Sequence, residues 1–135
     1  MNMETKNRLN DILINIPTRA DARGEAVKIM TVAMTGWPTR DIVSLLTNPG
    51  VTRGNHYHKV KEEAFVVVTG RVLVKMVDVE TGERMEITLD GKNRQILLIH
   101  PYIAHTIKNI GDVPCWLVEM ENSDYDKNDD YKFEV

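Results

Sequence analysis

Cysteine, long apolar runs and an apolar leader are what this sequence has least of. One cysteine occurs among the 135 residues, so no internal disulfide can form, and Cys115 beside Trp116 and Leu117 is typical of a buried structural thiol. No apolar run approaches the roughly 20 residues that a membrane-spanning helix needs. The first ten residues lack the apolar region of a secretory signal. These absences predict a cytoplasmic protein.

The chain also lacks a surplus of charge of either sign. Its formal net charge is −3, and its 17 Lys and Arg residues are scattered along the sequence, which leaves no basic patch for nucleic acid. Apolar residues make up 42%, an ordinary share for a globular domain, which argues against wholesale disorder. The length suits one domain with one core. We expect neither nucleic acid nor a membrane as a partner.

Helical periodicity is missing as well, and short β-prone runs take its place. They recur at roughly 8–12-residue spacing with turn residues between them, which predicts an all-β sandwich or closed barrel. The polar segment 17–23 is expected to be a turn between the first two runs. A further strand is expected around His56. The runs are 11–16, 24–33, 41–46, 64–68, 71–79, 83–89, 94–99, 105–109 and 114–121.

The C-terminal residues have a different composition from the rest. We expect residues 1–122 to form the barrel, including the N-terminal strands, and residues 123–135 to form an acidic tail. Either the tail is solvated, or its aromatic residues dock it onto the barrel or onto a second subunit. The aromatic residues are Tyr125, Tyr131 and Phe133.

One stretch concentrates residues that bind metals. His56 and His58 are separated by one residue, so on a β-strand they share a face and Tyr57 points the other way. Glu63 follows five residues after His58, and a turn between them returns its carboxylate beside the imidazoles. Because His105 can add a third nitrogen, we expect one divalent metal ion per chain, bound by His56, His58, Glu63 and His105. Zinc is favoured, and Ni, Fe, Mn or Cu suit the same ligands.

The spacing of this stretch resembles the first motif of the cupin superfamily. Every fixed position is matched: Gly50, five residues, His56-x-His58, four residues, Glu63, six residues and Gly70. The resemblance implies a cupin jelly-roll β-barrel, or double-stranded β-helix, in a single domain.

The second cupin motif is only partly kept. His105 and Asn109 have the expected spacing. However, His100 stands where a proline is usual, Pro101 comes one place late, and Tyr102 replaces a glycine. The first motif therefore carries the assignment.

Within the cupins, several segments resemble enzymes that act on sugar nucleotides. Residues 53–58 resemble the metal-binding C-terminal cupin domain of the bifunctional capsular polysaccharide reductase/epimerase. Residues 21–24 and 93–99 resemble dTDP-4-dehydrorhamnose 3,5-epimerases, and residues 123–125 are similar to sugar 3,4-ketoisomerases. The rhamnose-pathway epimerases work without metal and have a lysine where this chain has Glu63. The metal-containing branch is therefore the direct analogue.

The resemblance implies an epimerase or ketoisomerase that acts on a 4-keto-6-deoxy nucleotide sugar in surface polysaccharide biosynthesis. We expect the chemistry near His56 and His58, but the sequence names no general base. Two alternatives remain open: a cupin that binds a metal or small ligand without turnover, and an iron-dependent cupin dioxygenase.

Arg53 is the candidate for substrate binding. Its guanidinium suits bidentate contact with the pyrophosphate of a nucleotide sugar, although it could simply hold the turn. Three positions separate Arg53 from His56, so an extended strand would place them on opposite faces. Gly54 must therefore redirect the chain, which a glycine permits because it tolerates positive φ.

Other polar residues near the motifs are expected to be structural. Glu62 is expected in solvent, Arg23 to be structural, and His100 to lie in a turn. Lys75 and Tyr102 could line the barrel.

A homodimer is also expected. Small barrels have exposed edge strands, which proteins commonly cover. The β-prone run 11–16 is placed to cover the edge of a partner subunit.

Overall fold

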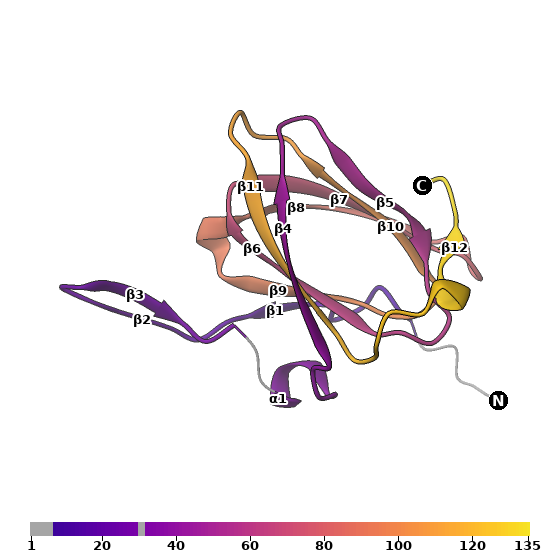
Figure 1. Ribbon diagram of the computed structural model, residues 1–135, viewed down its shortest axis with the longest axis horizontal. Coiled ribbons are helices and arrows are strands. Elements are labelled where there is room, and N and C mark those ends of the chain that lie inside the picture. Colours follow the sequence, from indigo (N-terminus) through magenta and orange to yellow (C-terminus); the bar gives the residue numbers. More distant parts are fainter. Residues whose placement is uncertain (1–6, 30–31) are drawn as a thin grey trace.

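The computed structural model describes residues 7–29 and 32–135, and two five-stranded sheets dominate it (Figure 1). The first sheet contains, in spatial order, β1 (Leu13–Asn15), β9 (Gln95–Ile99), β6 (Glu63–Thr69), β11 (Cys115–Glu121) and β4 (Asp41–Thr47). The second contains β12 (Tyr131–Lys132), β5 (Thr52–Tyr57), β10 (Ile103–Asn109), β7 (Arg71–Asp78) and β8 (Arg84–Asp90). Neighbouring strands are antiparallel, and the sheets pack as a β-sandwich. The predicted all-β fold is confirmed.

Alternating side chains build the core between the sheets. Along β7, Val72, Val74 and Met76 are buried, whereas Arg71 and Lys75 are exposed. This period of two directs one set of side chains to the opposite sheet and the other to solvent. Burying each such apolar side chain contributes about 1.5–3 kcal/mol.

The first sheet is covered on its outer face as well at strand β6. Successive residues 63–67 of β6 are all buried, so both faces of this strand are covered. Ile12, Ile16 and Trp37 belong to the same hydrophobic cluster as β6 and β9. The chain therefore folds its own N-terminal segment over this sheet, and the continuous apolar run of β6 follows from burial on both sides.

Two expectations for the N-terminal region are wrong. Segment 17–23 is not only a turn, because β2 (Thr18–Asp21) pairs with β3 (Gly24–Val27) in a hairpin. The turn itself is tight, since the Asp21 carboxylate accepts hydrogen bonds from the backbone N–H and the side chain of Arg23.

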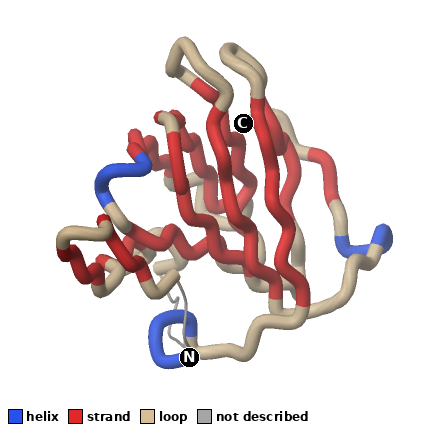
Figure 2. Tube along the Cα trace, turned by 60° about the vertical axis from the view of Figure 1, so that its left-hand side comes forward, coloured by secondary structure: helices blue, strands red, loops and turns tan. Residues whose placement is uncertain are grey.

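The run 24–33 does not stay a strand to its end. The strand stops at Val27, and Val32–Thr35 form α1, a single helical turn; residues 30 and 31 lie outside the described part. The Thr35 hydroxyl donates to the carbonyl of Trp37 and accepts from its backbone N–H, which ends the turn. Figure 2 shows α1 at one end of the sandwich. Single 3-10 turns occur at Gly91–Asn93 and Lys127–Asp129.

The run 11–16 covers an edge of its own chain. Leu13, Ile14 and Asn15 pair with β9, and Ile12 accepts a further backbone hydrogen bond from Leu98. Ile12 is 2% exposed, so this pairing also buries apolar surface within the subunit. Within the subunit this segment thus covers the edge of β9, and its expected contact with the edge of a partner stays a prediction.

The C-terminal tail docks onto the barrel. Strand β12 pairs with the edge of β5, with Tyr131 opposite Tyr57. The two rings stack with centroids 5.3 Å apart, and Phe133 packs edge-on against Tyr57. The aromatic residues of the tail thus hold it beside the strand that carries the histidines. No helix in the described ranges is long and apolar enough to cross a membrane.

Candidate functional site

Strands of both sheets bring the four predicted metal ligands together. His56 lies on β5 directly opposite His105 of β10, His58 follows the end of β5, and Glu63 begins β6 in the other sheet. Glu63 Oε1 lies 3.4 Å from His58 Nε2 and 3.6 Å from His105 Nε2. The ring of His56 has its centroid 5.0 Å from that of His58 and 4.9 Å from that of His105.

Two buried atoms at the centre of this cluster have no hydrogen-bond partner among the described residues. They are His58 Nε2 and Glu63 Oε1, and both are closed off from solvent. A buried polar atom without a partner costs about 1–3 kcal/mol. A cation between the imidazoles and the carboxylate would satisfy both atoms, so these residues fit a metal ion.

The protonation states of the cluster suit metal binding. Burial lowers the pKa of His105, and burial together with the neighbouring His58 lowers the pKa of His56, so both imidazoles favour the neutral form. Burial opposes the charge of Glu63, but a hydrogen bond with Glu119 and electrostatic interactions with His105, His58 and Lys61 outweigh it and lower its pKa. Neutral imidazoles and an ionised carboxylate are the forms that metals bind.

His56 differs from the other histidines in its surroundings. Its side chain is 31% exposed, against 6% for His58 and 2% for His105. Its Nδ1 lies 3.2 Å from a carboxylate oxygen of Asp130 in the tail. His58 and His105 therefore converge on Glu63, whereas His56 faces both the cluster and an acidic group near solvent.

Two further carboxylates lie beside Glu63. Carboxylate oxygens of Glu63, Glu119 and Glu121 lie within 4.8 Å of one another, and Lys61 Nζ is 2.9 Å from Glu121. Burial, hydrogen bonds with Glu63 and Glu121 and repulsion from both raise the pKa of Glu119 to about 11. Glu119 therefore holds a proton and can donate a hydrogen bond to the ionised Glu63.

Glu119, Glu121 and Lys61 were not among the residues predicted for the site. Strand alternation along β11 could have found the first two, because residues 115, 117, 119 and 121 share one face and the first two are apolar and buried. Two glutamates at the inner positions of such a strand indicate buried carboxylates that need partners.

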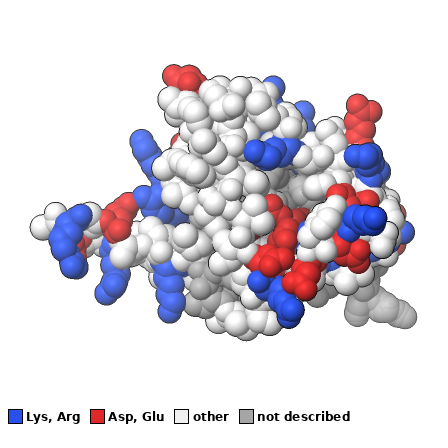
Figure 3. Space-filling view, viewed as in Figure 1, with Lys and Arg blue, Asp and Glu red and all other residues white. Residues whose placement is uncertain are grey.

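A cavity of about 240 Å³ opens between the sheets next to the cluster. Its polar lining comes from Arg53, His56, His105 and Glu119, and its apolar lining from residues such as Phe65. Figure 3 shows the surface hollowed in this region, with Asp and Glu side chains gathered beside the hollow. Two of the predicted ligands thus face a space in which a small molecule can lie.

A bulge in β5 brings Arg53 to the same cavity as His56. Gly54 has φ +113° and Asn55 φ +60°, and the pairing with β10 shifts register at this point. The extra residue reverses the alternation, so Arg53 and His56 face one cavity, as the sequence predicts for a redirecting Gly54. The guanidinium is held by hydrogen bonds to the hydroxyl of Thr47 (2.9 Å) and a backbone carbonyl (3.1 Å).

The expectation that Glu62 lies in solvent is wrong. Its side chain is partly buried and lies 3.1 Å from His100 Nδ1, because the turn after β9 brings His100 beside it. His100 and Tyr102 line a separate hollow of about 540 Å³ with Arg8. Lys75 is exposed on β7, and Tyr102 lines the separate hollow. Neither residue therefore lines the cavity of the metal cluster.

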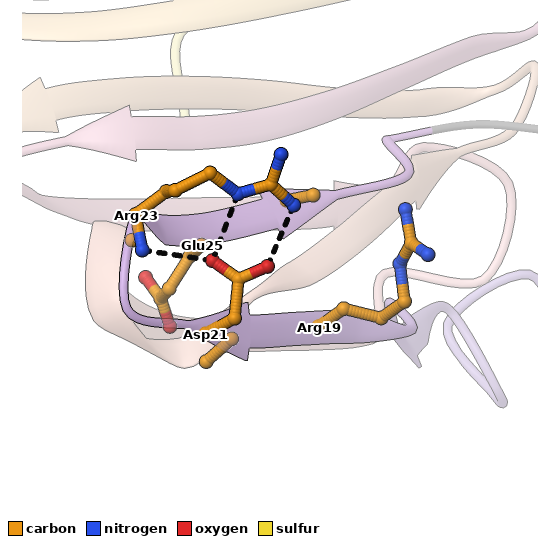
Figure 4. A pocket seen from close by; sticks show the side chains of 7 residues that line it. Arg19, Asp21, Arg23 and Glu25 are labelled. Carbon is orange, nitrogen blue, oxygen red and sulfur yellow. Dashed lines mark hydrogen bonds and ion pairs between the residues drawn. The ribbon is translucent and has the colours of Figure 1, made fainter.

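The hairpin of β2 and β3 carries a larger but shallow hollow of about 590 Å³ (Figure 4). In it, Arg23 pairs with Asp21 at 2.7 Å and is 90% exposed, in agreement with a structural role. The hairpin projects from the barrel on the side away from β5 and β12 (Figure 1). The histidine cluster, not this hollow, is therefore the candidate site.

Comparison with known proteins places the chain in a family. Residues 19–133 match the family described as the polysaccharide biosynthesis C-terminal domain. The chain belongs to this family. A curated relative, the UDP-2-acetamido-2,6-beta-L-arabino-hexul-4-ose reductase of Pseudomonas aeruginosa, is 32% identical over 123 residues, covering 90% of the chain and 32% of the relative.

Solved structures agree with this polysaccharide biosynthesis assignment. The capsular polysaccharide assembling protein CapF of Staphylococcus aureus is 28% identical with a TM-score of 0.68, over 89% of this chain and 34% of that one. The chain therefore spans about a third of the length of these two relatives. The Mycobacterium tuberculosis rmlC epimerase superposes with a TM-score of 0.78 at 20% identity, over 95% of this chain and 72% of that one. A 3,4-ketoisomerase from Helicobacter canadensis superposes with a TM-score of 0.78 at 19% identity, over 87% of this chain and 86% of that one.

The likeness to the epimerase and the ketoisomerase shows the fold, which is the cupin barrel. The resemblance found in the sequence is thus confirmed for both family and fold.

Proposed function

We propose that the chain is an epimerase or ketoisomerase of a 4-keto-6-deoxy sugar joined to a nucleoside diphosphate, in surface polysaccharide biosynthesis. The observation that carries this proposal is the cavity in which Arg53, His56 and His105 meet beside the buried Glu63 cluster. Support also comes from the names of similar proteins. The Pseudomonas relative is named for a UDP-hexul-4-ose, and a ketoisomerase neighbour is described in complex with TDP-4-keto-6-deoxyglucose.

The reaction needs a base beside a carbon that adjoins the ketone. A hydrogen on that carbon is acidified, and the negative charge moves to the ketone oxygen when the hydrogen leaves as a proton. We assign the base to His56, which lines the cavity and turns Nδ1 toward Asp130. Its Nε2 then remains for the substrate, and the carboxylate orients the ring.

The metal belongs to the same proposal. We infer that His58, Glu63 and His105 hold one divalent ion per chain, with zinc favoured. When bound, the ion would supply Lewis acidity to the ketone oxygen. The prediction that His56 is a fourth ligand has a direct test: His56→Ala should keep the metal if His56 is the base, and lose much of it if His56 is a ligand.

Arg53 is assigned to the pyrophosphate. Its guanidinium is already held at the cavity by Thr47, so little rotational freedom is lost on binding. A fixed, planar cation is suited to two phosphate oxygens at once.

Solvent exchange tests the activity. The metal-loaded protein is incubated in deuterated water with dTDP- or UDP-linked 4-keto-6-deoxy sugars, and NMR follows C3 and C5. We expect deuterium at one of these carbons, lost in His56→Ala and kept in His100→Ala, since His100 lies outside the cavity. No exchange with several such sugars would refute the isomerase and favour a binding protein; oxygen uptake with added iron would favour a dioxygenase.

We also propose a homodimer. Among the described strands, β4 is an edge of the first sheet, and its Ile42 and Leu46 share an outer face with Trp116 of β11. These side chains are 69%, 46% and 44% exposed, an apolar patch of the kind that proteins bury between subunits. Light scattering should give twice the chain mass, and Trp116→Glu should reduce it to one; a monomeric parent protein at micromolar concentration would contradict the proposal.

A further inference from the structure

The C-terminal tail reaches the metal cluster from outside the barrel. Its 3-10 turn, Lys127–Asp129, lies across the end of β5. His58 Nδ1 lies 2.5 Å from the backbone carbonyl oxygen of Asp129. The carboxylate of Asp129 lies against the segment that connects His58 to Glu63. One residue of the tail thus contacts both a predicted ligand and the loop that leads to the next.

The first contact determines which nitrogen of His58 carries the proton. A carbonyl oxygen only accepts hydrogen bonds, so Nδ1 must be the donor. In a neutral imidazole, Nε2 then has a free lone pair. Nε2 is the atom that lies 3.4 Å from Glu63 Oε1 and lacks a hydrogen-bond partner in the described structure. The tail therefore leaves His58 in the form that can bind a cation.

The second contact holds the loop between the two ligands. The Asp129 carboxylate accepts from the backbone N–H groups of Lys59 (2.7 Å), Val60 (3.2 Å) and Lys61 (2.9 Å). Three consecutive amides around one carboxylate form a compact anion-binding turn. Because the loop begins at His58 and ends near Glu63, its shape sets the distance between their side chains.

The tail is itself anchored, so it can hold these groups in place. Asp126 caps the 3-10 turn by accepting from the backbone N–H of Asn128 at 2.9 Å. On the other side, Tyr131 stacks on Tyr57, and Lys59 Nζ lies 4.3 Å from the centre of the Tyr131 ring. Asp129 therefore lies between the capped 3-10 turn and the stacked Tyr131, which both restrict its movement.

We propose that Asp129 is a positioning residue of the metal centre, which fixes the tautomer of His58 and the shape of loop 59–61. The proposal rests on the proposed metal binding by His58, Glu63 and His105. Outer contacts that orient ligands typically change metal affinity by about 10–100-fold. We expect a loss in that range when the Asp129 carboxylate is removed.

Two variants and a control test the metal-binding effect. Asp129→Ala removes all three loop hydrogen bonds, and Asp129→Asn keeps one acceptor oxygen and should restore part of the affinity. Asp124→Ala is the control, because it removes the same charge from an exposed site in the tail that pairs with Arg40. Titration with Co²⁺ against a chromophoric chelator gives the dissociation constant, and the visible absorption of Co²⁺ reports the ligand geometry. Wild-type affinity in Asp129→Ala would overturn the proposal.

A second measurement needs no metal, and it distinguishes failure of the proposed role of Asp129 from failure of the proposed metal binding. Long-range ¹H–¹⁵N NMR on the metal-free protein reports which nitrogen of His58 carries the proton. Asp129→Ala keeps the backbone carbonyl but removes the carboxylate that anchors it to loop 59–61, so the carbonyl is no longer held against His58 Nδ1. We therefore expect Nδ1–H in the parent protein and in Asp124→Ala, and a mixture of tautomers in Asp129→Ala. An Nε2–H tautomer in the parent overturns the role of Asp129. If the tautomers behave as expected but the parent binds no metal, the metal proposal fails instead. If Asp129→Ala does not fold, both measurements are made on Asp129→Asn, and parent-like affinity and tautomer in that variant overturn the proposal.

Discussion

Replacing Gly54 by alanine tests the local geometry on which the whole cavity depends. Gly54 has φ +113°, a conformation that side chains disfavour, and it also touches the neighbouring strand. A Cβ added there would lie 2.4 Å from the backbone oxygen of His105 and 3.0 Å from Cα of Thr106. Because both contacts are with backbone atoms, β10 must move, and His105 must move with it.

Two contributions determine how much Gly54→Ala lowers the free energy of unfolding. Backbone strain at positive φ costs about 1–2 kcal/mol for a residue with a Cβ. Overpacking against a strand adds about 1–3 kcal/mol. We therefore expect Gly54→Ala to lower the free energy of unfolding by about 2–5 kcal/mol, out of a total of about 5–15 kcal/mol for a domain of this kind.

Gly82→Ala is the matched control. Gly82 also has positive φ, +81°, but an added Cβ would meet no atom within 4 Å. This variant should show the strain term alone, about 1–2 kcal/mol. The gain from a stiffer unfolded chain is the same for both variants, so it cancels in the comparison.

Urea unfolding, followed by circular dichroism, measures both variants. The difference in their unfolding free energies reports the close approach of β5 to β10. We expect Gly54→Ala to be the less stable by about 1–3 kcal/mol, and to bind UDP more weakly, because Arg53 and His56 no longer face one cavity. Equal stability of the two variants would refute the close approach as a constraint on this bulge.

The remaining predictions concern single side chains. Arg53→Ala should weaken dTDP or UDP binding by about 1.5–3 kcal/mol, roughly ten- to a hundredfold, and leave the metal in place; calorimetry that shows parent-like affinity would contradict this. His58→Ala should lower the metal content sharply by elemental analysis, whereas Glu62→Gln should not. Lys61→Met should destabilise the fold by about 3–5 kcal/mol, because it removes the cation that pairs with the buried Glu121 carboxylate, and a loss below about 1 kcal/mol in urea unfolding would rule that out.

Strands could be predicted from the sequence where alternation is sustained, and less well where segments are short. The hairpin of β7 and β8 has eight and seven residues per strand, and its period of two is visible in the sequence. The hairpin of β2 and β3 has four residues per strand, all exposed or nearly so, and therefore shows no apolar alternation. The single turn α1 is also too short to show a helical period.

The sequence by itself determined that His56, His58 and Glu63 form a cluster, whereas His105 was assigned from its place in the second cupin motif. A strand places alternate residues on one face, and the spacing of glycines, histidines and glutamate defines one strand-turn-strand unit. The need for Gly54 to turn Arg53 toward the site could be inferred in the same way, from an odd separation along a strand. Both inferences depend on residues within a few positions of one another.

Only the tertiary structure decided which groups surround that cluster. Glu119 approaches Glu63 and Glu121 approaches Lys61 because β11 lies beside β6, and Asp129 reaches His58 because the tail pairs with β5. These partners are about 60–70 positions apart in the chain. The order of strands in a sheet and the docking of a tail depend on how the whole core is buried. The residues involved show no periodic pattern in the sequence from which these contacts could be predicted. Local spacing therefore determined most of the cluster, and long-range packing determined the protonation and orientation of its members.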